Sequence, residues 1–183
     1  MLDHLKFLGM DRFDCTLWDV LKDHSKYYVD LSDRFKLLVE ILEVLVFIQS
    51  KKISHKDVKA SNIFVRTVVL QGSVQSNKKG IILGKWVLGD FGLSSKITEL
   101  RGSSGTPGFA SMEQFDGKPS PKSDNYSFAK LAVLILFPWN TAWYFLSYPI
   151  SNTDFMNKTW RNHKIFGYIS SLLDVSFENI LYF

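Results

Sequence analysis

Four side chains suited to acid–base, phosphate or metal chemistry lie within eight positions of the sequence. The stretch ISHKDVKASNIFV, residues 53–65, contains His55, Asp57, Lys59 and Asn62. An aspartate can accept a proton or bind a metal ion, a lysine can bind phosphate, and an asparagine can offer an amide oxygen to a hard cation. Asp and Asn also favour turns, because their side chains hydrogen-bond to the nearby backbone. Taken alone, the stretch is consistent with a catalytic loop or with a polar turn.

The residues before this stretch predict a long amphipathic helix. The run from Phe35 to Ile48 is apolar with a helical period, and Ser32 is predicted to cap the helix, with Asp33 in its first turn. The expected apolar side consists of Phe35, Leu38, Val39, Leu42, Leu45 and Val46.

The residues after the stretch predict a β-hairpin. Two β-branched and aromatic runs, IFVRTVVL and IILGKWVL, flank the polar and basic stretch QGSVQSNKKG, which would form the tip. The segment GDFGLSSKITELRGSSGTPG is rich in Gly and Ser and is predicted to be a mobile loop, and a second apolar helix should begin near Ser123. Shorter elements are predicted in residues 4–10 (a strand), in TLWDVLKDH (a helix) and in IFGYISSLL (a helix).

Four motifs follow one another in a specific order. The HKDVKASN stretch is followed by DFG at residues 90–92, then by GTPGFASME at residues 105–113 and SDNYSFA at residues 123–129. Each motif alone is weak evidence, but in this order they resemble the C-terminal lobe of the protein kinase family. The resemblance implies an α+β fold, mostly α-helical, in which a small β-hairpin carries the catalytic and DFG motifs. It implies one partial kinase domain over residues 1–183, formed by the hinge and the C-terminal lobe.

The resemblance implies a role for each chemically competent side chain. Asp57 would be the catalytic base that orients the substrate hydroxyl, and Lys59 would contact the γ-phosphate of ATP. Asn62 and Asp90 would bind Mg²⁺, since amide and carboxylate oxygens suit a hard cation. These roles, with Lys59 two residues after the base and Thr106 in GTPGF, imply a serine/threonine kinase that transfers the ATP γ-phosphate to a protein hydroxyl.

Other positions would bind the nucleotide or meet the substrate. The segment GMDRF would be the hinge and place Asp11 and Phe13 beside the nucleotide, with Phe64 beneath the adenine ring. Thr106 and Gly108 would belong to the loop that contacts the protein substrate, and Thr106 would hydrogen-bond the base and the lysine.

Four further residues would have structural roles. His55 would pack under the DFG phenylalanine, Phe91, and has no implied part in proton transfer. Glu113 corresponds to the glutamate of the A-P-E motif, although SME replaces that tripeptide here, and Ile180 falls where its arginine partner is expected. Asp124 would open the long buried helix and hold the catalytic loop.

The sequence also departs from the family pattern. No Gly-rich loop, strand lysine or helix glutamate precedes the catalytic motif, so the N-terminal lobe is expected to be missing. The final helices of the C-terminal lobe are also expected to be missing, and the chain would then be a fragment or a degenerate kinase. Ser103 and Ser104 are possible phosphorylation sites, but Lys56 stands where the family usually has an arginine and lacks its planar fork. A pseudokinase or interaction module, which keeps this lobe as a binding surface without catalysis, is the alternative function.

The bulk composition limits the partners. The 183 residues have a net charge of +4, which favours anionic ligands such as ATP, but no basic block indicates nucleic acid. The single cysteine, Cys15, is consistent with a cytoplasmic location, and no signal peptide is evident. The apolar run from Leu131 to Leu146 could be a membrane segment or a buried helix, and the kinase resemblance favours the buried helix without a membrane partner.

Overall fold

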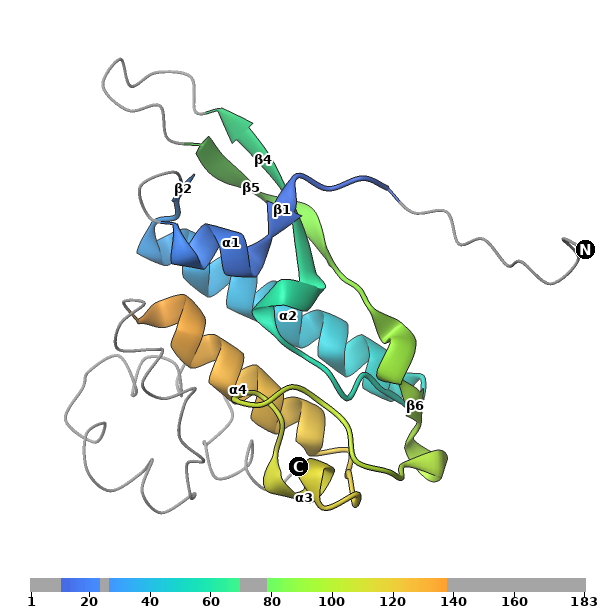
Figure 1. Cartoon of the computed structure of the whole chain (residues 1–183). Coiled ribbons are helices and arrows are strands. Elements are labelled where there is room, and N and C mark those ends of the chain that lie inside the picture. The colour runs from blue at the N-terminus through green and yellow to red at the C-terminus, as the bar shows by residue number, and fades with distance from the viewer. Residues whose placement is uncertain (1–10, 24–26, 70–78, 138–183) are drawn as a thin grey trace, which may run out of the picture.

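Two helices at the centre of the molecule supply half of the buried core cluster in the described part of the chain (Figure 1). The computed structural model describes residues 11–23, 27–69 and 79–137. Helix α2 spans Leu31–Ser50 and packs against helix α4, Ser123–Leu136. The fully buried side chains of this core include Leu17, Leu37, Ile41, Leu45, Ile63, Leu131, Leu134 and Ile135.

Helix α2 was predicted correctly as a helix, but its cap and its buried face differ from the prediction. The N-cap is Asp30 rather than Ser32, because the Asp30 carboxylate accepts a hydrogen bond from the Asp33 amide at 2.8 Å. Val39 and Val46, expected on the apolar side, are 40% and 59% exposed. Because α4 and the sheet pack on only one side of α2, the buried face is the row formed by Leu37, Leu38, Ile41, Leu45 and Ile48.

The predicted hairpin is present within a four-stranded sheet. Strand β4, Ile63–Val69, pairs antiparallel with β5, Lys79–Leu88. The last two residues of the predicted tip, Lys79 and Gly80, belong to β5, and the rest of the tip, 71–78, lies outside the described residues. Two short strands complete the strand order β1-β4-β5-β2: β1, Cys15–Thr16, and β2, Tyr27–Tyr28. A hydrogen bond of 2.6 Å from Trp86 Nε1 to Glu40 Oε2 ties β5 to α2.

The short helix predicted in TLWDVLKDH is present and directly follows β1, a strand that was not predicted. Helix α1 spans Leu17–Lys22 and begins with a capping box in which the Thr16 hydroxyl accepts from the Asp19 amide and the Asp19 carboxylate accepts from the Thr16 amide. Its inner face buries Leu17 and Val20 in the core.

The Gly- and Ser-rich segment, predicted as a mobile loop, contains several short elements. Strand β6, Ser95–Lys96, pairs antiparallel with β3, Ile53–Ser54. The segment also contains two single turns of 3₁₀ helix, η2, Phe91–Leu93, and η3, Ile97–Glu99. A further turn of 3₁₀ helix, η1, Ala60–Asn62, lies in the catalytic stretch directly before β4. The four-residue helix α3, Met112–Phe115, lies between this segment and α4. These elements give the expected α+β arrangement.

The apolar run near the end of the described chain is a core helix over Leu131–Leu136, because all of these residues except Ala132 are buried. In the described part of the chain, no helix combines the length and hydropathy needed to cross a membrane. The remainder of the run, together with the elements predicted at residues 4–10 and in IFGYISSLL, and Ile180, lies outside the described residues.

Candidate active site

Asp57, Lys59 and Thr106 form a closed network of three short contacts. Thr106 Oγ1 donates to Asp57 Oδ1 at 2.6 Å, and Lys59 Nζ lies 2.7 Å from both Asp57 Oδ2 and Thr106 Oγ1. Thr106 is 49 residues from Asp57 in sequence, so the fold brings the predicted substrate loop onto the predicted catalytic loop.

The Asp57 carboxylate is buried but remains ionised at neutral pH. Only 6% of the residue is exposed. Burial raises the pKa of the Asp57 carboxyl, but the hydrogen bonds donated by Lys59, Thr106 and Asn62 outweigh this effect and lower the pKa below its ordinary value. The site therefore holds a negative charge that is available to a hydroxyl donor.

Asn62 ends η1, directly before β4, and its side-chain amide nitrogen bonds to the catalytic loop. Its Nδ2 donates to the Asp57 carbonyl oxygen at 2.9 Å and to Asp57 Oδ2 at 3.1 Å. Among the described residues, no donor hydrogen-bonds to Asn62 Oδ1. This orientation leaves the amide oxygen, which is the atom that suits a hard cation, open to a ligand.

Asp90 lies two residues after the end of β5 and has a left-handed backbone, with φ of 60° and ψ of 64°. Its exposed carboxylate accepts a hydrogen bond of 3.4 Å from the Gly92 amide. Because β4 and β5 are antiparallel neighbours, the residues at their paired ends, Asn62 before β4 and Asp90 after β5, lie at the same end of the hairpin. The described residues contain no cluster of three or more His, Cys, Asp or Glu side chains that could hold a metal ion.

His55 is a fully buried neutral histidine. Its Nε2 donates to the Gly89 carbonyl oxygen at 3.0 Å, and its Nδ1 accepts from the Asp57 amide at 3.3 Å, which is the pattern of the neutral Nε2–H tautomer. Burial lowers the pKa of His55. Its ring packs against Phe91, with the two ring centroids 4.6 Å apart. His55 thus connects the catalytic loop to the DFG segment.

Asp124, at the first turn of α4, holds the backbone that precedes Asp57. Its fully buried carboxylate accepts hydrogen bonds from the His55 amide at 2.7 Å, the Lys56 amide at 2.8 Å and the Ser54 hydroxyl at 2.9 Å. Lys56 has a φ of 65°, which lysine rarely adopts. The loop is therefore anchored to the buried helix on its N-terminal side.

Two aromatic residues face each other beside the hairpin. The rings of Phe13 and Phe64 are 6.3 Å apart between centroids, and the Arg66 guanidinium lies 5.4 Å from the Phe13 centroid. Arg66 also forms an exposed ion pair of 3.2 Å with Asp11. The structure thus groups the three residues predicted to bind the nucleotide: Asp11, Phe13 and Phe64.

The predicted substrate loop lies on the catalytic loop where Gly105 packs closely against it. A Cβ atom at Gly105 would lie 2.6 Å from Ala110 Cβ and 3.2 Å from the Lys56 carbonyl oxygen, so a larger residue would force the loops apart. Gly105 and Gly108 both have a φ of 90°. Ser103 is exposed, whereas the Ser104 hydroxyl oxygen is buried and has no hydrogen-bond partner within the described ranges. Glu113 is half-buried.

The candidate site contains a residue that the sequence analysis did not identify. Gln114 is fully buried, and its Nε2 donates to the Lys56 carbonyl oxygen at 2.9 Å. Its Oε1 accepts from the Ser111 amide at 3.1 Å, which forms a capping box at the start of α3. The Ser111 hydroxyl donates to the Ser123 hydroxyl, which in turn donates to the Glu113 carboxylate at 3.4 Å. The S-x-x-Q pattern in SMEQ is the sequence signal that could have indicated the capping box between Ser111 and Gln114.

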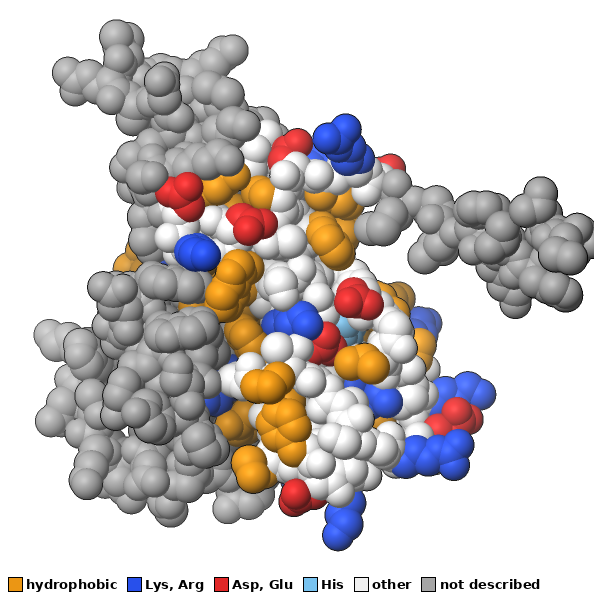
Figure 2. All heavy atoms as spheres, in the orientation of Figure 1, with side chains coloured by type: hydrophobic (Ala, Val, Ile, Leu, Met, Phe, Trp, Pro, Cys, Tyr) orange, Lys and Arg blue, Asp and Glu red, His pale blue; other side chains and the backbone are white. Residues whose placement is uncertain are grey.

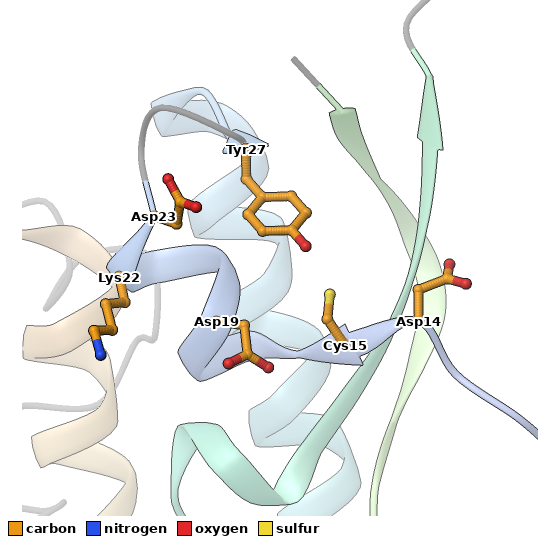
Figure 3. Close-up of a pocket in the computed structure, with 6 residues that line it drawn as sticks. All are labelled: Asp14, Cys15, Asp19, Lys22, Asp23 and Tyr27. Carbon is orange, nitrogen blue, oxygen red and sulfur yellow. The ribbon is translucent and has the colours of Figure 1, made fainter. Parts of the chain in front are cut away.

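Figure 2 shows acidic, basic and histidine side chains gathered near the centre of one face of the molecule. A separate hollow of about 570 Å³ lies beside α1 and is lined by Asp14, Cys15, Asp19, Lys22, Asp23 and Tyr27. In this hollow, the Tyr27 ring and the Cys15 thiol point toward one another (Figure 3). Since none of the predicted site residues lines it, the hollow is distinct from the candidate active site.

Comparisons with known proteins identify the fold and the family. Residues 4–144 match the family model described as the protein kinase domain. A chain in the crystal structure of the yeast RNA Pol II CTD kinase CTDK-1 complex is similar in fold, with a TM-score of 0.53 and 20% identity, covering 68% of this chain and 38% of that one.

Curated relatives are similar over about half of the chain. The mitosis inhibitor protein kinase SWE1 of Candida albicans is 37% identical over 82 residues, which are 45% of this chain and 6% of the relative. The eukaryotic translation initiation factor 2-alpha kinase 1 of Plasmodium falciparum is 34% identical over 51% of this chain and 5% of its own length. The serine/threonine-protein kinase C of Synechocystis is 33% identical over 55% of this chain and 18% of its own length. The chain thus spans less than a fifth of each of these relatives.

The matched model covers more than three quarters of the sequence, and the matched segment contains every residue of the Asp57 network. Similarity over this length, together with the kinase-like fold, establishes the family. The chain belongs to the protein kinase family.

Proposed function

We propose that this chain is the catalytic lobe of a protein serine/threonine kinase, which transfers the γ-phosphate of ATP to a hydroxyl of a protein substrate. The observation that carries the proposal is the contact network of Asp57, Lys59 and Thr106, with distances of 2.6 and 2.7 Å. A carboxylate, a cation and a hydroxyl from the substrate loop converge there on one point.

Asp57 is proposed as the base. An incoming serine or threonine hydroxyl would donate a hydrogen bond to its carboxylate and lose its proton to it, as the oxygen–phosphorus bond forms and the bond to the ADP oxygen breaks. The lowered pKa of Asp57 keeps this group ionised, so its main contribution would be to orient the hydroxyl.

Lys59 and Thr106 support the serine/threonine class. The Lys59 ammonium is placed to compensate negative charge on the transferred phosphate, because it already lies beside Asp57 on the loop that would meet the substrate. Thr106 connects Lys59 to the base through its hydroxyl, so substrate docking near residues 106–108 would act directly on the catalytic group.

The donor set at the end of the hairpin fits Mg²⁺. Asp90 would contribute an exposed carboxylate, and Asn62 would contribute the amide oxygen that its hydrogen bonds to Asp57 leave open. When bound with ATP, Mg²⁺ would neutralise charge on the phosphates. Two protein ligands suit this ion, which usually takes its remaining ligands from phosphate and water.

The aromatic pair fits the adenine ring. Phe64 is half-buried and packs so closely on Gly89 that a Cβ there would lie 2.7 Å from the ring. With Phe13 it would offer one apolar wall of the nucleotide pocket, next to the predicted hinge at Asp11.

The test is phosphate transfer from labelled Mg-ATP to a Ser/Thr peptide library, by this chain and by the protein that its complete gene encodes. Asp57→Asn should lower kcat by roughly 10²- to 10⁴-fold, because it removes the proton acceptor while preserving the side-chain shape. Asp116→Asn, on the exposed end of α3, is the matched control and should leave kcat unchanged.

If neither protein transfers phosphate, or if Asp57→Asn retains wild-type transfer, the proposal is wrong. In that case the pseudokinase alternative, in which the lobe is a binding surface, would be favoured.

A further inference from the structure

We propose that Gln114 is a positioning residue that holds the catalytic loop and the substrate loop in register. It acts on Asp57 through the preceding residue, Lys56. The family motifs assigned no role to Gln114, and the proposal depends on its contacts with both loops.

The first observation is the strained peptide before the base. Lys56 has a left-handed backbone with a φ of 65°, which an L-residue other than glycine keeps only when its surroundings hold it. Asp124 holds the Lys56 amide at 2.8 Å, and Gln114 Nε2 holds the Lys56 carbonyl oxygen at 2.9 Å. These two hydrogen bonds clamp both polar groups of the residue.

The second observation is that Gln114 contacts the other loop as well. Its own carbonyl oxygen accepts from the Ser104 amide at 3.3 Å, two residues before Thr106. Its side-chain oxygen accepts from the Ser111 amide at 3.1 Å, on the far side of Thr106. One buried residue therefore bonds to the segments on both sides of Thr106 and to the loop that carries Asp57.

The third observation is that Gly105 packs closely against the Gln114–Lys56 hydrogen bond. A Cβ at Gly105 would lie 3.1 Å from Gln114 Nε2 and 3.2 Å from the Lys56 carbonyl oxygen. The backbone at Gly105 thus closes over the Gln114–Lys56 hydrogen bond and excludes water from it. A hydrogen bond in such a place is difficult to replace, since a carbonyl that loses its donor there finds no solvent partner.

These contacts explain how Gln114 would affect the chemistry. If the Lys56 carbonyl were released, the backbone could relax from its left-handed conformation and change the direction of the chain at Asp57. The carboxylate would then move relative to the Thr106 hydroxyl, now 2.6 Å away, and to Lys59. A displacement of about 1 Å at a catalytic group can reduce the rate by roughly 100-fold.

The experiment compares Gln114→Met with a matched control, Gln49→Met, in the full 183-residue chain. Methionine keeps the length of glutamine but cannot donate to Lys56. Gln49 donates its side-chain amide to Asn125 at 3.1 Å between α2 and α4, so its substitution also removes a glutamine contact between segments without touching either loop. If Gln114→Met fails to fold, Gln114→Glu preserves the shape and the acceptor for Ser111 while removing the donor.

The first readout is amide hydrogen exchange at Lys56 and Asp57, corrected for the global free energy of unfolding. In either Gln114 variant, exchange at these two amides should be roughly tenfold faster than in wild type, whereas Gln49→Met should leave it unchanged. Equal exchange rates in the Gln114 and Gln49 variants would overturn the proposal.

The second readout rests on the proposed function. In a protein that transfers phosphate, Gln114→Met should lower kcat by roughly 10- to 100-fold with an unchanged KM for Mg-ATP, because orientation is lost rather than nucleotide binding. A raised KM with unchanged kcat would overturn the positioning role. If the wild-type protein transfers no phosphate, the proposed function fails, while the exchange measurement still decides the role of Gln114.

Discussion

The environment of Asp57 and His55 shows how burial acts on single ionisable groups in this lobe. Both residues are buried. The three side-chain donors around Asp57 lower the pKa of its carboxyl and keep it charged, whereas burial lowers the pKa of His55 and favours the neutral ring. The Gly89 carbonyl oxygen requires a proton on His55 Nε2, and the Asp57 amide requires a lone pair on Nδ1. A second proton on His55 would break the contact with the Asp57 backbone.

We therefore predict that the protein loses stability as the pH falls below about 6.5, the ordinary pKa of histidine. Because the pKa of His55 is lowered in the folded state, the unfolded chain binds the proton first and unfolding becomes more favourable. NMR titration of the His55 ring should give a pKa below that of the same residue in a peptide covering residues 50–60. A pKa equal to or above the peptide value would contradict the assigned tautomer.

Helix α4 and the catalytic loop illustrate how elements far apart in the chain create the site. The loop has little regular structure of its own, and its geometry comes from the buried carboxylate at the start of α4. Asp124 lies 69 residues after His55, yet it satisfies two successive backbone amides of the loop and the Ser54 hydroxyl. The loop is ordered because a core helix supports it.

Removing the Asp124 carboxylate should therefore be costly. We expect Asp124→Ala to lower the free energy of unfolding by about 3 kcal/mol, because it leaves buried amide donors at His55 and Lys56 without acceptors. The measurement is urea unfolding monitored by circular dichroism. Asp116→Ala, at an exposed position, should change the same quantity by less than about 0.5 kcal/mol, and an equally small effect of Asp124→Ala would show that the loop does not depend on α4.

For the molecule as a whole, the net charge of +4 and the open end of the hairpin favour a polyanionic ligand. Asp90, Asn62 and the Phe13–Phe64 pair lie at one end of the β4–β5 hairpin, so a ligand bound there would contact residues before β1 and residues on both strands' flanks at that end. Such a ligand would stabilise the folded chain by connecting these segments.

We expect Mg-ATP to raise the thermal stability of this chain. A ligand that binds only the folded state adds about 2.7 kcal/mol at a concentration of 100 times its dissociation constant. The measurement is a thermal melt across a series of Mg-ATP concentrations, with Mg²⁺ alone as the reference. Asp90→Asn should reduce the stabilisation, since it removes the proposed carboxylate ligand. An unchanged melting temperature at millimolar Mg-ATP would argue for the binding-surface alternative.

The sequence alone determined the main elements and the order of the motifs. The helix before the catalytic stretch, the β4–β5 hairpin and the helix from Ser123 depend on local periodicity and propensity, which neighbouring residues carry. Asp57 and Asp90 could be identified as candidate site residues from the sequence because each belongs to a short, contiguous motif.

The contacts between residues far apart in the chain follow from the packing of the folded molecule. The tertiary structure showed that Val39 and Val46 are exposed, since the buried face of α2 depends on where α4 and the sheet pack. It also placed Gln114 on the Lys56 carbonyl, 58 positions away in sequence. A periodic pattern specifies that a helix has an apolar side, but the partners of a buried polar group depend on distances between remote segments, which only the packed fold defines.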